Sequence, residues 1–121
     1  MSKFCIRETA SGVKFDLQAA NGQVILTSEV YTSRAAAIKG VASVRSNAPL
    51  AKLEDQTGKD YGVLANPKFE LYRDKAGEYR FRLKARNGKI VGFSEGYSTR
   101  AGCLNGIDSV RKNAPRAETE E

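Results

Sequence analysis

The feature that most constrains this chain is an internal repeat. The phrase "SVRSNAP" at 43–49 returns as "SVRKNAP" at 109–115, which is 66 residues later. When 21–51 is aligned with 87–117 at that offset, 15 of 31 positions are identical and no gap is needed. Chance does not produce such agreement. The chain therefore contains two copies of one unit of about fifty residues, and the fold must use both copies.

The second copy predicts three strands. Within 78–86, apolar residues alternate with basic ones, and this period of two is typical of a strand with one buried face and one solvent face. Segments 68–74 and 89–97 predict the neighbouring strands. The "NG" pairs at 21–22 and 87–88 predict hairpin turns in which both residues have positive φ. The first copy repeats the buried alternation with Val13, Phe15, Leu17 and Ala19.

A helix follows the third strand in each copy. Ser98 or Thr99 is placed to cap the second helix, which is predicted to run to about Lys112. Asn113 favours a left-handed residue at its end, and Pro115 cannot extend it. The stripe that faces the sheet is predicted to comprise Cys103, Leu104, Ile107, Val110 and Arg111.

Both helices contain a glycine near the middle, Gly40 and Gly106. Glycine in a helix interior costs about 1 kcal/mol relative to alanine. Since both copies accept this cost, we predict that each helix approaches the sheet, or the other helix, closely at this residue.

These elements predict an α+β fold. Short fourth strands are expected at 50–54 and 116–120, so each copy is strand–strand–strand–helix–strand. One copy alone exposes sheet edges and only half a core. We therefore expect a single domain in which the repeats, 3–54 and 68–119, joined by linker 55–67, share a mainly antiparallel sheet. The helices should lie on one face, with a pseudo-twofold axis between the copies.

The pattern "F.LYRD..GEYRFRLKA.NG", followed by "SEGY" and "NAP", resembles the YegP-like family. These are small bacterial proteins of unknown function, built from one or two such repeats. The resemblance implies that the copies exchange their last strands: 50–54 would pair with the second half, and the tail after Pro115 with the first. It implies no catalytic residue. The first copy departs from the pattern with Val30, Ala36 and Ala37, so a thiol-based role would belong to the second copy alone.

Composition excludes several kinds of site. The chain has no histidine, which removes the usual general base and the commonest metal ligand. No glycine-rich phosphate loop is present. We expect no signal peptide, no membrane span, no metal and no cofactor, and we expect a cytoplasmic protein with two free thiols. The formal charge of +6 is compatible with a polyanionic partner but does not require one.

Two pairs of residues suggest chemistry, and both also have a structural interpretation. Cys103 lies on the apolar helix stripe and is expected to be a buried core residue, whereas Cys5 is expected to be half-exposed and inert. Glu29 and Glu95 would form a carboxylate pair if they met across the pseudo-twofold axis. We favour a structural role for them, because each precedes a helix N-terminus, where negative charge is stabilised.

The strongest candidate interaction surface is a basic stripe. On one strand the solvent face would carry Arg80, Arg82, Lys84 and Arg86, which suits contact with a phosphate backbone. The first copy has Lys14, Asp16, Gln18 and Ala20 at these places, so the stripe is not duplicated. The other interpretation, which we favour, is a solvated sheet face that charge keeps soluble.

We therefore expect a non-enzymatic module, monomeric, that binds another protein or a small ligand. The alternative is a nucleic-acid-binding protein that uses the stripe.

Overall fold

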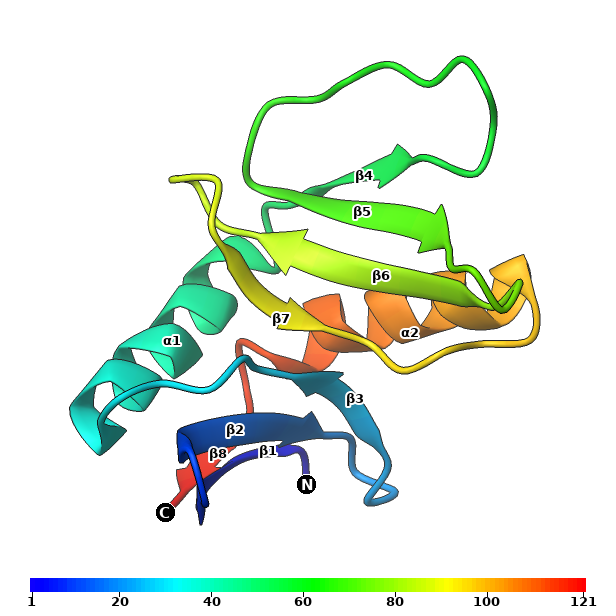
Figure 1. Ribbon diagram of the computed structural model, residues 1–121. Coiled ribbons are helices and arrows are strands. Elements are labelled where there is room, and N and C mark those ends of the chain that lie inside the picture. The colour runs from blue at the N-terminus through cyan, green and yellow to red at the C-terminus, as the bar shows by residue number, and fades with distance from the viewer.

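Eight strands form one continuous sheet in the computed structural model, which describes residues 1–121 (Figure 1). Both helices lie on the same face of that sheet. The α+β prediction is confirmed. The first copy forms β1 (Lys3–Thr9), β2 (Gly12–Gln18), β3 (Val24–Thr27), α1 (Arg34–Asn47) and β4 (Lys52–Asp55). The second forms β5 (Lys68–Arg73), β6 (Tyr79–Lys84), β7 (Ile90–Phe93), α2 (Arg100–Asn113) and β8 (Glu118–Glu120).

The order of strands shows how the copies share the sheet. It runs β4-β5-β6-β7-β3-β2-β1-β8, which is symmetric about the central β3–β7 pair. The last strand of each copy crosses to the far edge of the other copy: β4 pairs with β5, and β8 pairs with β1, both in parallel. The remaining pairs are antiparallel. The strand exchange implied by the family resemblance is therefore present.

Helix arginines hold the start of each exchanged strand. Arg111 of α2 donates a hydrogen bond of 2.9 Å to the carbonyl oxygen of Ala51, directly before β4. Its guanidinium lies over the ring of Phe69, 5.1 Å from the centroid. Arg45 of α1 does the same in the other direction, bonding the carbonyl oxygen of Ala117 and lying 4.9 Å from the ring centroid of Phe4.

A second pair of arginines holds the far end of each exchanged strand. Arg100, the first residue of α2, donates to Asp55 at 2.9 Å, at the end of β4. Arg34, the first residue of α1, lies 3.6 Å from Glu121, directly after β8. Each helix therefore holds the two ends of a strand from the other copy through its own first and last turns. This explains why these arginines recur in the repeat.

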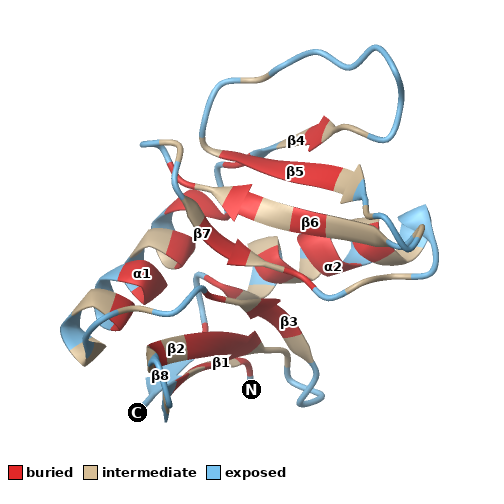
Figure 2. Ribbon diagram, viewed as in Figure 1, coloured by how far each residue is buried: buried red, intermediate tan, exposed pale blue.

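The core is continuous across the two copies. Figure 2 shows buried residues along the strands and on the helix faces that cover them. α1 packs on β1 and β2 and reaches β7, while α2 packs on β6 and reaches β3. At the centre of each half an edge-to-face phenylalanine pair is buried; these pairs are Phe4–Phe15 and Phe69–Phe81. Cys103, Ile107 and Val110 of the predicted stripe are fully buried, as expected.

The mid-helix glycines mark the predicted close approaches. A Cβ built on Gly40 would lie 2.7 Å from Cζ of Tyr31 and 2.9 Å from the ring of Phe15. Gly106 meets Tyr97 and Phe81 in the same way. In each copy the tyrosine hydroxyl lies over the helix backbone, and only glycine leaves room for it.

Two local predictions were wrong. The hairpins after β2 and β6 have positive φ at Gly22 and Gly88 alone, because the paired hydrogen bonds close a type I turn followed by a glycine bulge. Asn113 is not left-handed: α2 continues through it to an α-helical Ala114. Its side chain instead bonds back to Ser109, at 2.8 Å to the carbonyl oxygen.

Thr99, one of the two expected caps, is the N-cap of α2. Neither helix is long and apolar enough to cross a membrane.

Replacing Gly40 with alanine should lower the free energy of unfolding by about 1–2 kcal/mol. Overpacking against Tyr31 and Phe15 costs about 1–3 kcal/mol, and this outweighs the gain of up to about 1 kcal/mol in helix propensity. The measurement is urea unfolding followed by circular dichroism. Gly62→Ala is the control, because no atom lies within 4 Å of a Cβ there. A Gly40→Ala protein as stable as the wild type would disprove the close approach.

Candidate functional site

The basic stripe lies mainly on β6. Arg80, Arg82 and Lys84 alternate with the buried Phe81 and Leu83, so they face away from the helices. Arg86 comes after the end of β6 and is exposed in the β6–β7 hairpin. The structure therefore brings three of the four predicted residues onto one strand face.

Three of the four stripe residues are paired with acidic side chains. Glu70 of β5 lies opposite Arg82 and accepts from it at 2.5 Å, and its other oxygen is 3.3 Å from Lys84. Arg80 pairs with Asp74 at 2.6 Å. Burial alone would raise the pKa of Glu70, but the hydrogen bond and charge of Arg82, followed by Lys84, lower it. Of the stripe, only Arg86 has no ion pair.

The same network continues under the linker. Lys68 bridges Glu70 and Glu54, at 3.5 Å and 2.8 Å, and the backbone N–H of Leu64 also donates to Glu54. Burial would raise the pKa of Glu54, but these hydrogen bonds together with that of Gln56 lower it to about 2. Because the ordinary value is 4.5, the ionised pair stabilises the fold above that pH, and this stability is lost as the pH falls toward 2. The network fastens the linker to the sheet.

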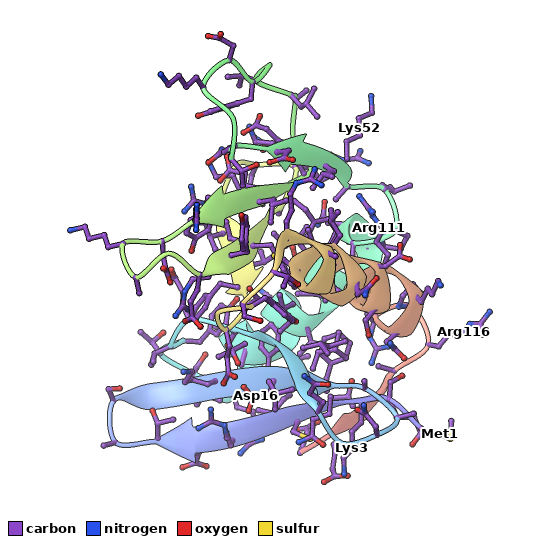
Figure 3. The ribbon with its side chains drawn as sticks, turned by 90° about the vertical axis from the view of Figure 1, so that its right-hand side faces the viewer. Met1, Lys3, Asp16, Lys52, Arg111 and Arg116 are labelled. Atoms are coloured by element: carbon purple, nitrogen blue, oxygen red, sulfur yellow. The ribbon has the colours of Figure 1, made fainter.

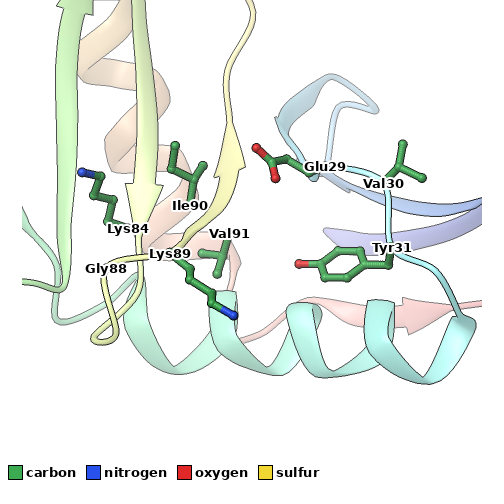
Figure 4. Close-up of a pocket in the computed structure, with 8 residues that line it drawn as sticks. All are labelled: Glu29, Val30, Tyr31, Lys84, Gly88, Lys89, Ile90 and Val91. Atoms are coloured by element: carbon green, nitrogen blue, oxygen red, sulfur yellow. The ribbon is translucent and has the colours of Figure 1, made fainter.

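A cleft opens where the two copies meet. Its volume is about 490 Å³, within the range of small-ligand sites. Figure 4 shows Glu29 and Tyr31 directed from segment 29–31 of the first copy toward β7 of the second, with Lys89 directed toward α1. Half of the lining is apolar. The eight lining residues are Glu29, Val30, Tyr31, Lys84, Gly88, Lys89, Ile90 and Val91.

The central strand pair explains why this cleft exists. β3 and β7 are joined through one residue pair, Thr27 and Phe93. Beyond it the two halves separate, and segment 29–31 faces the β6–β7 hairpin across the gap. Tyr31 stacks on Phe15, with ring centroids 6.0 Å apart, and its pKa is raised by burial and then by the charge of Glu29. The tyrosine therefore forms a fixed wall.

The repeat places a smaller cleft on the opposite side of the junction. It has a volume of about 170 Å³ and lies between the β2–β3 hairpin and α2, with Tyr97 in the place of Tyr31. Where the larger cleft has Lys89, this one has Gln23. The two clefts thus differ in both size and charge.

The two glutamates of the predicted carboxylate pair are exposed. Glu29 lines the larger cleft, whereas Glu95 lines neither. Arg34 and Arg100, which follow them at the helix starts, pair instead with Glu8 and Glu121 and with Asp55. Sequence patterns could not locate the cleft, because it is assembled from loops of different copies.

Comparison with known proteins places these features in a family. A family model described as a domain of unknown function, DUF1508, matches residues 9–55 and matches again at 74–121. The chain belongs to the DUF1508 family. The two matches correspond to the two copies of the repeat, which the sequence alone had indicated.

Members of the DUF1508 family match at two lengths. A UPF0339 protein of Bordetella pertussis is 40% identical over 119 residues, which is 98% of this chain and 93% of that protein. A UPF0339 protein of Treponema denticola is 57% identical over 54 residues, which is 45% of this chain but 93% of that protein. The solution structure of yegP from E. coli, described as of unknown function, matches with a TM-score of 0.80 and 34% identity, over 98% of this chain and 90% of that one. The predicted YegP-like relationship is confirmed.

The two thiols of this DUF1508 protein lie in different environments. Cys103 is fully buried, and burial followed by the charge of Asp55 raises its pKa to about 11. Cys5 is half-buried, and burial raises its pKa against the opposing effect of Lys3. Both shifts favour the unreactive thiol over the nucleophilic thiolate.

Replacing Cys103 with alanine should cost about 1 kcal/mol, at the low end of the range for core truncations. The first copy already has Ala37 at this place, where it is likewise fully buried. The measurement is urea unfolding of the reduced protein. A loss several times larger, or a disulfide detected by mass spectrometry without reductant, would contradict a packing role.

Proposed function

We propose that this protein is a small, monomeric, non-enzymatic binding module of the cytoplasm, whose ligand occupies the cleft between the two copies. The observation that carries the proposal is the cleft itself. It is built from both copies, and it is walled by Tyr31, whose ring is fixed by stacking and by contact with the helix. A repeat fold that leaves such a site at its junction offers a preformed place for a ligand.

The lining of the cleft suggests the class of ligand. Ile90 and Val91 supply an apolar wall, whereas the side chain of Val30 points away from β7 (Figure 4). Lys89 supplies a positive charge and Glu29 a negative one, on opposite sides of the cleft (Figure 4). A zwitterion with an apolar body complements this arrangement. A short apolar peptide with free termini, about the size of a dipeptide, suits a site of this volume.

The titratable groups of the cleft support binding rather than catalysis. The raised pKa of Tyr31 keeps its phenol protonated, which is the opposite of what a general base needs. Lys84 is engaged by Glu70 at 3.3 Å. The remaining groups, Glu29 and Lys89, belong to opposite sides and are suited to fixing a charged ligand.

Nucleic-acid binding through Arg80, Arg82, Lys84 and Arg86 stays a prediction. The pairing of three of these residues with Glu70 and Asp74 argues against it, because paired arginines must exchange one anion for another in order to contact phosphate.

Titration with leucyl-leucine, followed by two-dimensional NMR of the ¹⁵N-labelled protein, tests the proposal. Saturable shifts are expected for the amides of 29–31 and 88–91. Lys89→Gln should weaken binding by about tenfold or more, because hydrogen bonds to charged groups contribute about 1.5–3 kcal/mol. Glu29→Lys should abolish binding, because it replaces the negative side of the cleft with a second positive charge.

The controls separate cleft binding from general effects. Glu95→Lys makes the same charge change at the equivalent exposed residue of the second copy, which lines neither cleft, and should leave the titration unchanged. The N-acetylated, C-amidated dipeptide should bind more weakly than the free one, because it carries neither charge. The proposal fails if leucyl-leucine leaves the cleft amides unmoved, or if Glu29→Lys binds it as well as the wild type.

A further inference from the structure

A second basic surface lies at the C-terminal end of α2. It comprises Lys52, Arg111, Lys112 and Arg116, and is called here the basic end of α2. The last three, with Pro115, line a depression of about 520 Å³. Lys52 joins them because Arg111 bonds the carbonyl oxygen of Ala51, the residue before it. Figure 3 shows Lys52, Arg111 and Arg116 along one side of the molecule.

Three of the four charges of this surface have no acidic partner in the protein. Lys52 and Arg116 are exposed and form no ion pair. Lys112 has one acidic neighbour, Asp108, at 3.7 Å, and both side chains are more than half exposed. Arg111 bonds a carbonyl group and an aromatic face, so its charge is positioned but not cancelled. The contrast with the stripe on β6 is direct, since three of the four stripe residues have acidic partners.

The first copy provides an internal comparison. At the corresponding end of α1, the residues equivalent to Arg111, Lys112 and Arg116 are Arg45, Ser46 and Leu50. Glu118, the first residue of the strand that Arg45 holds, is equivalent to Lys52. The end of α2 therefore carries four positive charges, while the end of α1 carries one positive and one negative charge. The shared fold does not require this accumulation of charge.

The helix dipole explains only part of it. Basic residues in the last turn are stabilised by the negative end of the dipole, and this applies to Arg111 and Lys112. Lys52 and Arg116 lie outside the helix, so the dipole does not explain them.

We infer that the basic end of α2 binds the phosphate backbone of nucleic acid. Three cations without acidic partners, beside a depression lined by Arg111, Lys112, Pro115 and Arg116, suit a chain of phosphates better than an apolar or zwitterionic ligand. Lysine and arginine contacts of this kind position a protein on the backbone and do not discriminate sequence. The inference does not depend on the cleft between the copies, which lies at the β3–β7 junction.

Fluorescence anisotropy with a labelled DNA duplex of about 20 base pairs, and with an RNA strand of similar length, tests the inference at about 50 mM salt, where backbone contacts are strongest. The wild type should bind both. The triple variant Lys52→Glu, Lys112→Ser, Arg116→Leu gives the end of α2 the residues found at the end of α1, and it spares Arg111, which holds β4. It should bind at least about tenfold more weakly, with a salt slope lower by about three units.

Two further variants make the result specific. Lys75→Glu, Lys59→Ser, Lys39→Ser makes the same change in net charge at exposed residues without ion pairs, and should bind much as the wild type does. The stripe variant Arg80→Ser, Arg82→Ser, Lys84→Ser, Arg86→Ser tests the competing surface. The inference is overturned if the wild type binds neither probe, if the triple variant retains binding, or if only the stripe variant loses it. Thermal unfolding of each variant confirms that it is folded.

Discussion

The structure depends on the exchange of the last strand of each copy. β4 and β8 each leave the copy that encodes them and complete the edge of the other. Each is held at its start by an arginine in the last turn of a helix and at its end by the arginine that begins the same helix. A guanidinium suits this task, because its fixed fork of donors bonds a carbonyl oxygen or a carboxylate while its flat face lies on an aromatic ring. The repeated phrase "SVR.NAP" contains the arginine that holds the start of each exchanged strand.

Because the last strands are exchanged, the two copies are held together by more than the central β3–β7 pair. β3 and β7 meet through a single residue pair, yet the sheet remains continuous because helices and edge strands cross between the copies. The weak centre leaves room for a cleft on either side. The copies differ at both clefts and at both helix ends: Lys89 faces one cleft and Gln23 the other, while the end of α2 is basic and the end of α1 is not.

Much of the fold was predictable, because repetition and periodicity are local signals. The alternation around Phe81, the helix stripe and the significance of Gly40 and Gly106 all follow from spacing. The candidate sites depend on register and on contacts between the copies, which spacing does not contain. Glu70 neutralises Arg82 only because β5 pairs with β6 at that register. Lys52 joins Arg111 only because β4 crosses to the other copy. The crossing of the last strands was predicted only from the family resemblance, and no pattern within the sequence predicted the cleft.

The most direct test of this account is to separate the copies. Residues 1–60 and 61–121, produced as independent fragments, are examined by circular dichroism and analytical ultracentrifugation. Each fragment keeps its own last strand but lacks the edge on which that strand pairs. The account predicts that neither is a folded monomer, so that each is either unfolded or a dimer that exchanges the strand between two identical chains. Two stable, folded, monomeric fragments would contradict it.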